Sequence, residues 1–144
     1  MSEPSLNLTA LRNAIASLEG GLGLVGNSIW FDQQLPVVQD MLIAGVIQHF
    51  EFVYELSIKT IRRQIELESD SPDQIDRTNF RDMLRIAGEK GIVADVEAWF
   101  AYRKTRNISA HTYDREIAQQ VYKDTQKFIG DAGSLLAGLE ARNE

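Results

Sequence analysis

The feature that most constrains this chain is a run of helical periodicity that continues from Pro36 to about Glu68. Pro36 suits the first turn of a helix, where its missing N–H costs nothing. The run carries an apolar stripe and a polar stripe, each repeating every three or four residues, which predicts one long helix with two distinct faces. The apolar stripe is Ile43, Ile47, Phe50, Tyr54, Ile58, Ile61 and Ile65, and the polar stripe is Gln48, Glu51, Glu55, Lys59, Arg62 and Glu66.

Four further helices are expected around the long one. Ser71 and Pro72 read as an N-cap and first helical residue, and Gly91 as a stop signal. Thr112 is the expected N-cap of the last helix, and "GNS" at 26–28 is an expected connector. No segment alternates like a strand, so the chain is expected to fold as one all-α domain over 1–144, an up-and-down bundle of four to five helices. The expected helices cover about 6–24, 36–68, 72–90, 95–104 and 114–139.

Composition narrows the class of protein. The 144 residues contain no cysteine, which excludes disulfides and thiolate metal sites. The opening residues lack a basic region followed by an apolar run, and no fully apolar membrane-spanning stretch stands out, so we expect a cytoplasmic protein with no membrane partner. The net charge of −6 argues against a non-specific nucleic-acid coat protein, although it leaves room for a local basic pocket.

An eight-residue stretch, RNISAHTY at 106–113, gathers groups that suit phosphate chemistry. The imidazole of His111 can take a proton from a hydroxyl or return one to a leaving oxygen. The guanidinium of Arg106 offers a permanent bidentate charge to a phosphate, and Asn107 can orient either the phosphate or the imidazole. These residue types suffice in principle for metal-free RNA cleavage by the ribose 2′-hydroxyl. The alternative interpretation is a polar helix end with no chemistry.

Two basic clusters hold six of the 15 basic residues. They form an anion site if the fold brings them together, and two solvated patches if it does not. The clusters are Lys59, Arg62 and Arg63, and Arg103, Lys104 and Arg106.

Other signals in the sequence favour structural roles. His49 lies in the long helix, where a histidine is usually structural or exposed. Glu51 and Glu55 share one helical face, which is compatible with an acid–base pair, but a salt link from Glu55 to Lys59 is the expected default. The glycines at 20–26 follow a helix and lack the lysine of a phosphate-binding loop, and the two histidines lack metal-ligand spacing. We therefore expect no metal site and no cofactor.

Three segments resemble one known family. RNISAHTY matches the Arg-x4-His-x-Tyr form of the HEPN superfamily motif, and residues 47–66 and 91–114 resemble the long helix and the motif region of its nucleotidyltransferase substrate-binding branch. One departure is Ser57-Ile58, where the family places a bulkier residue before the lysine, and this bears on packing.

The resemblance implies a fold, a site and partners. Members are helical bundles that usually form two-fold dimers, and in nuclease members Arg and His from both subunits meet in an interface cleft. Carried over, Arg106 holds the phosphate, Asn107 is the polar residue beside it and His111 transfers protons. Many members are encoded beside a minimal nucleotidyltransferase that adenylylates the motif tyrosine, here Tyr113, and silences the RNase.

Three functions remain open at this stage. The first is a metal-independent RNase toxin neutralised by a partner minimal nucleotidyltransferase, with Arg103, Lys104 and Lys59 helping to bind RNA. The second is a non-catalytic subunit that binds nucleotide or substrate for that nucleotidyltransferase. The third is a structural helical interaction module. The first two predict a nucleotidyltransferase partner, and the RNase reading also predicts a homodimer, because a two-fold interface doubles one thin Arg–His set.

Overall fold

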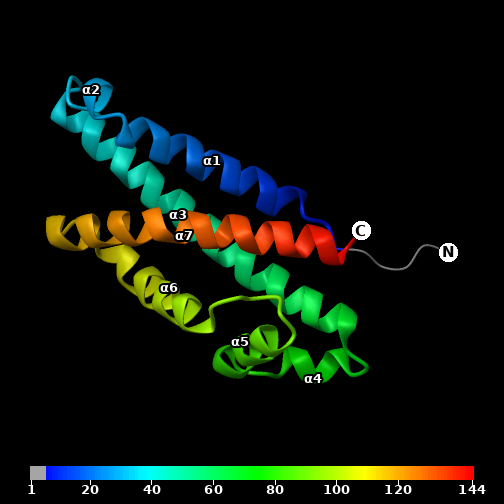
Figure 1. Ribbon diagram of the computed structural model, residues 1–144. Coiled ribbons are helices and arrows are strands. Elements are labelled where there is room, and N and C mark those ends of the chain that lie inside the picture. The colour runs from blue at the N-terminus through cyan, green and yellow to red at the C-terminus, as the bar shows by residue number, and fades with distance from the viewer. Residues whose placement is uncertain (1–5) are drawn as a thin grey trace.

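The computed structural model describes residues 6–144, and four long helices carry the fold (Figure 1). The first five residues lie outside the described residues. They belong to the opening segment in which the sequence shows no basic region followed by an apolar run. The long helices are α1 (Thr9–Gly26), α3 (Pro36–Glu68), α6 (Val96–Ile108) and α7 (Arg115–Arg142), and the shorter ones are α2 (Ser28–Phe31), α4 (Pro72–Asp76) and α5 (Phe80–Glu89).

The long helices alternate in direction, as expected for an up-and-down bundle (Figure 1). The α1 and α3 helices form a hairpin that turns at α2, and α7 packs against both. The end of α7 returns to the start of α1, where Arg12 and Glu140 form an ion pair of 3.2 Å. The predicted all-α class is therefore confirmed over residues 6–144, which contain no strand.

The core forms where α3, α6 and α7 meet. The Phe128 ring is fully buried and makes edge contacts with three other rings, at centroid distances of 4.9 Å to Phe50, 5.6 Å to Trp99 and 4.9 Å to Tyr102. Such edge-to-face pairs are favoured by the charge distribution of aromatic rings. The predicted inward stripe of α7 is buried from Val121 to Leu139, so its periodicity identified the core face correctly.

The expected helix over 72–90 is wrong in one respect, because the chain breaks after Asp76 and resumes at Phe80. Asn79 accepts a hydrogen bond from the Asp82 amide at 2.8 Å and so begins α5. The Arg62 side chain satisfies two carbonyl groups at the break, those of Ile75 at 2.8 Å and Thr78 at 3.3 Å. A side chain distant in sequence therefore stabilises a break that local periodicity does not show.

Other helix ends also differ from expectation. Ser71 makes no side-chain capping bond, and Asp114 rather than Thr112 caps α7 by accepting from the amides of Glu116 and Ile117. The expected connector at 26–28 ends in a short helix, which Asn27 caps. Gly91 has a φ of +77° and ends the α5 segment as predicted, since this conformation favours glycine. The expected helix over 95–104 continues to Ile108.

The α3 helix matches its predicted bounds, Pro36–Glu68. By length and composition it could cross a membrane, but it packs here against α1 and α7 within the bundle. Its buried face includes Ser57, which is fully buried and whose hydroxyl has no hydrogen-bond partner among residues 6–144. The departure from the family pattern at Ser57 therefore lies in the core, where it affects packing, as predicted.

Candidate functional site

The RNISAHTY segment spans the junction between α6 and α7. Arg106 lies in the last turn of α6, and a 3₁₀ turn, η1 (Ser109–His111), connects α6 to the loop before α7. The long α3 helix passes beside this junction and contributes two carboxylates to it. Three elements thus position the motif.

Arg106 is held by Glu51 and Glu55 of α3. Its Nη1 lies 2.7 Å from Glu51 Oε2, and its Nε and Nη2 lie 3.3 and 3.0 Å from Glu55 Oε1. About a third of the Arg106 side chain (32%) remains exposed. Two carboxylates surround one guanidinium and fix it in place. The three side chains together carry one excess negative charge.

Ser109 completes this network and was not singled out from the sequence. It is buried, and its hydroxyl lies 2.6 Å from Glu51 Oε2 and 2.8 Å from the Arg106 carbonyl oxygen, either of which can accept its one proton. The expected salt link from Glu55 to Lys59 is wrong, because Glu55 pairs with Arg106 instead. The shared face of Glu51 and Glu55 was the signal in the sequence, but their partner lies some fifty residues away.

His111 and Asn107 are exposed, beside the anchored arginine. The His111 ring makes no hydrogen bond within residues 6–144, and its only ring neighbour there is Tyr113, at a centroid distance of 6.0 Å. Tyr113 is 88% exposed and lines a hollow of about 650 Å³ between α3 and α7. The imidazole and the phenol are therefore both open to a substrate or to a partner enzyme.

The predicted substrate-binding residues have separate surroundings. The Arg103 guanidinium lies 4.3 Å above the ring of Phe80, and Lys104 lines a separate hollow between α6 and α7. Lys59 is exposed on α3. A shared anion site of the two basic clusters, and a role of these three residues in binding RNA, therefore stay predictions.

Tyr54 borders the site from within the core. Burial raises the pKa of its phenol to about 12, opposed by the nearby positive charges of Arg103 and Arg106. This tyrosine therefore stays neutral at physiological pH, and it is only 7% exposed. Tyr113 is the accessible tyrosine of the two.

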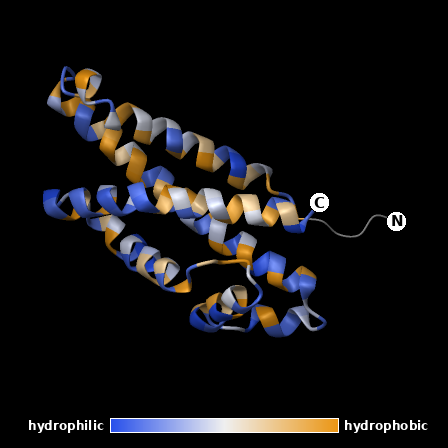
Figure 2. Cartoon of the chain, in the orientation of Figure 1, coloured by the Kyte–Doolittle hydropathy of each residue, from blue (hydrophilic) through white to orange (hydrophobic). Residues whose placement is uncertain are grey.

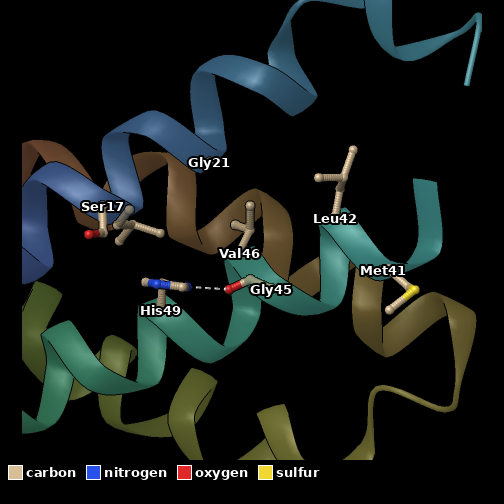
Figure 3. A pocket seen from close by; sticks show the side chains of 8 residues that line it. Ser17, Gly21, Met41, Leu42, Gly45, Val46 and His49 are labelled. Atoms are coloured by element: carbon tan, nitrogen blue, oxygen red, sulfur yellow. Dashed lines mark hydrogen bonds between the residues drawn. The ribbon is translucent and has the colours of Figure 1, made fainter. Parts of the chain in front are cut away.

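His49, the other histidine, has a structural environment. Its Nδ1 lies 2.8 Å from the Gly45 carbonyl oxygen, within its own helix, and its ring meets the edge of Phe52. It lines a small cavity between α1 and α3, which has a volume of about 180 Å³. Figure 3 shows His49 there among mostly apolar side chains. This position agrees with the structural role expected for His49.

Comparison with known proteins places the chain among relatives along nearly its whole length. The family described as nucleotidyltransferase substrate binding protein like matches residues 6–141. A probable ribonuclease HepT from Haemophilus influenzae is 44% identical over 144 residues, which cover 100% of this chain and 99% of the relative. A solved structure from Haemophilus influenzae, described as the fold of a substrate binding domain of a nucleotidyltransferase, has a TM-score of 0.91 and 44% identity. The match covers 93% of this chain and 99% of that one.

Proposed function

Because the chain belongs to the nucleotidyltransferase substrate binding protein family, in the HEPN superfamily, we propose that it is a metal-independent endoribonuclease controlled by a partner nucleotidyltransferase. The observation that carries the proposal is the pairing of an anchored Arg106 with an exposed His111 at one helix junction. The likeness to a probable ribonuclease supports the reaction, and the family supports the partner.

The proposed reaction uses the ribose 2′-hydroxyl as nucleophile. An imidazole takes the 2′-hydroxyl proton while the 2′-oxygen attacks the adjacent phosphorus, and the bond from phosphorus to the 5′-oxygen breaks. A protonated imidazole gives its proton to the departing 5′-oxygen, which leaves a 2′,3′-cyclic phosphate and a 5′-hydroxyl. Arg106 stabilises the charge that develops on the phosphoryl oxygens, and Asn107 orients the phosphate.

The carboxylates of Glu51 and Glu55 have a role in this scheme. They hold Arg106 in one orientation, which lowers the entropic cost of aligning it with a phosphate. They also compete with the phosphate for the guanidinium, so substrate must reach Arg106 through its exposed third or displace Glu55, the more exposed partner at 53%.

One protomer supplies a single histidine to this junction, whereas the reaction needs a base and an acid. A homodimer would supply both. The outward side of α3 exposes apolar Val37, Met41 and Phe52, and Phe52 directly follows Glu51. Exposed apolar side chains along one helix mark a surface for association. We place the two-fold interface along this side of α3, where it brings two Arg106–His111 sets into one cleft.

Tyr113 is the proposed point of control. Its hydroxyl would attack the α-phosphorus of ATP held by the partner nucleotidyltransferase, releasing pyrophosphate and losing its proton to a base of that enzyme. The product carries a bulky anionic adenylyl group beside His111, which excludes RNA by volume and by charge. An exposure of 88% makes this phenol accessible to another enzyme.

The decisive experiment is RNA cleavage in excess EDTA by the parent protein and by His111→Ala. The matched control is His49→Ala, which removes the other histidine of the chain, one with a structural environment. We expect cleavage by the parent and the control, with 2′,3′-cyclic phosphate ends, and none by His111→Ala. Equal cleavage by all three proteins, or cleavage abolished by EDTA, would contradict the proposal.

A non-catalytic nucleotide-binding or substrate-binding subunit is the second candidate. It is favoured by the two carboxylates on Arg106, which disfavour an incoming phosphate, and by the solved relative described as a substrate binding domain. Under this alternative none of the three proteins cleaves RNA. Expression of the chain alone would then leave growth unchanged, whereas the RNase predicts growth arrest that the partner nucleotidyltransferase relieves.

A further inference from the structure

Most basic side chains of this acidic protein are already engaged. Nine of the 15 pair with carboxylates, bond carbonyl oxygens or lie over aromatic rings: Arg12, Arg62, Arg63, Arg81, Arg85, Lys90, Arg103, Arg106 and Arg142. The other six make no such contact within residues 6–144. Three of those six, Lys104, Lys123 and Lys127, line one hollow.

This lysine hollow lies between α6 and α7 and has a volume of about 460 Å³. Lys104 comes from α6, whereas Lys123 and Lys127 are one turn apart on α7 and so share a face. Ile108, the last residue of α6, also lines it, and His111 follows three residues later. The hollow therefore extends to the junction that carries the motif.

The one carboxylate in the lysine hollow does not neutralise it. Asp124 accepts a hydrogen bond from Thr105 Oγ1 at 2.8 Å and another from Gln120 Nε2 at 2.7 Å, and it makes no ion pair with the three lysines. The lining has three ammonium groups and one carboxylate, and Asp131, which accepts a hydrogen bond from the lining Tyr102, adds a second carboxylate beside it. One excess positive charge remains in a chain whose net charge is −6. Figure 2 shows the first half of α7 as more hydrophilic than its second half.

We propose that the lysine hollow binds the phosphodiester backbone of single-stranded RNA and leads the strand to the Arg106–His111 junction. Flexible lysines act as point charges that suit successive phosphates without reading sequence. Lys123 and Lys127 are the new residues in this assignment, and they give the predicted binding role of Lys104 a location. The buried Tyr102 and the half-buried Ile108 form an apolar floor between the charges.

An acidic protein surface is the other class of partner for such a hollow, and RNA fits it better. A stable protein interface buries about 800 Å² on each partner around apolar or aromatic anchors. The lysine hollow has charge at its rim and an apolar floor, and its one aromatic ring, that of Tyr102, is buried and offers no anchor, which suits an extended polyanion. The proposed role of the lysine hollow rests on the RNase function, so its test must distinguish failure of RNA binding from failure of RNA cleavage.

The test measures RNA affinity against salt concentration. A single-stranded oligonucleotide binds the His111→Ala protein in EDTA, and the same measurement is made with Lys104, Lys123 and Lys127 also changed to Gln. Each phosphate contact on a single strand contributes about 0.7 to the slope of log K against log salt. We expect the triple change to reduce that slope by about 2 and to weaken binding about a hundredfold at 0.1 M salt.

The matched control changes Arg12, Arg77 and Arg85 to Gln, which removes the same charge away from the lysine hollow. We expect the slope of log K against log salt for this control to change by less than about 0.7, the contribution of one phosphate contact. Equal slopes for the lysine triple and the control, or no RNA binding at low salt, would overturn the proposal. The proposal would also be overturned if the triple lysine variant no longer bound the partner nucleotidyltransferase but showed an unchanged salt dependence of RNA binding. If the triple misfolds by circular dichroism, the three single changes, each expected to lower the slope by about 0.7, provide the same test.

RNA cleavage by the parent protein, measured in parallel, separates this proposal from the RNase. RNA binding that depends on the three lysines, without cleavage, contradicts the RNase function and supports RNA binding by the lysine hollow. Cleavage that is unchanged by the three lysine substitutions supports the RNase function and contradicts RNA binding by the lysine hollow.

Discussion

Replacing Glu68 with Gln tests how the ends of three helices are held together. Glu68 ends α3 and receives the Arg142 side chain from α7, with Nη2 at 2.6 Å and Nε at 3.0 Å. Lys90, just after α5, lies 3.3 Å away, and Arg142 also donates to the Lys90 carbonyl at 3.1 Å. The change keeps the size of the side chain and removes its charge.

The expected loss follows from the pKa of Glu68. Hydrogen bonds from Arg142, and to a lesser extent from Gln64, lower that pKa from 4.5 to about 2 against an opposing effect of burial. A full shift of this size corresponds to about 3 kcal/mol, since one pKa unit is worth about 1.4 kcal/mol. A quarter of the side chain (26%) is exposed, so solvent screening reduces our expectation to about 1–2 kcal/mol.

Thermal unfolding of the parent and Glu68→Gln proteins at several pH values measures this contribution. A folded-state pKa below the unfolded one stabilises the protein above pH 4.5, and this contribution is lost as the pH falls toward 2. We expect the variant to melt about 3–6 °C lower at pH 7 and the difference to shrink by more than half at pH 3. Glu19→Gln, an exposed change on α1, is the control. A difference that stays constant from pH 7 to pH 3 would refute the reasoning.

Three shorter predictions concern the core and the interface. Ser57→Ala removes a buried hydroxyl without a partner, so we expect urea denaturation to show equal or higher stability, by up to about 1 kcal/mol; a clear loss would reveal an unseen partner. Phe128→Ala removes the ring at the centre of the aromatic core and should cost about 3–5 kcal/mol in the same assay, and a cost below 1 kcal/mol would contradict this packing. Phe52→Glu places a charge on the proposed two-fold surface, so sedimentation should show monomer where the parent is dimeric; equal association would exclude this side of α3.

Much of the helical framework could be read from the chain because its signals are local. The bounds of α3 and the buried stripe of α7 follow from apolar spacing, which is set by the pitch of a single helix. Gly91 ends its segment for an equally local reason, its positive φ. Thr112 and Ser71 failed as caps because several residues near a helix start can accept the same amide bonds, and sequence does not rank them.

The site divides in the same way. The RNISAHTY segment places an arginine, an imidazole and a phenol within eight residues, so the sequence by itself brought the proposed chemistry to one junction between two helices. Only the tertiary structure decided that Glu51, Glu55 and Ser109 hold Arg106, and that Arg62 supports the break after Asp76. It also decided that Lys104 shares a hollow with Lys123 and Lys127. Local spacing fixes which side chains share a helical face, whereas the charged partner that each face meets depends on how separate helices pack.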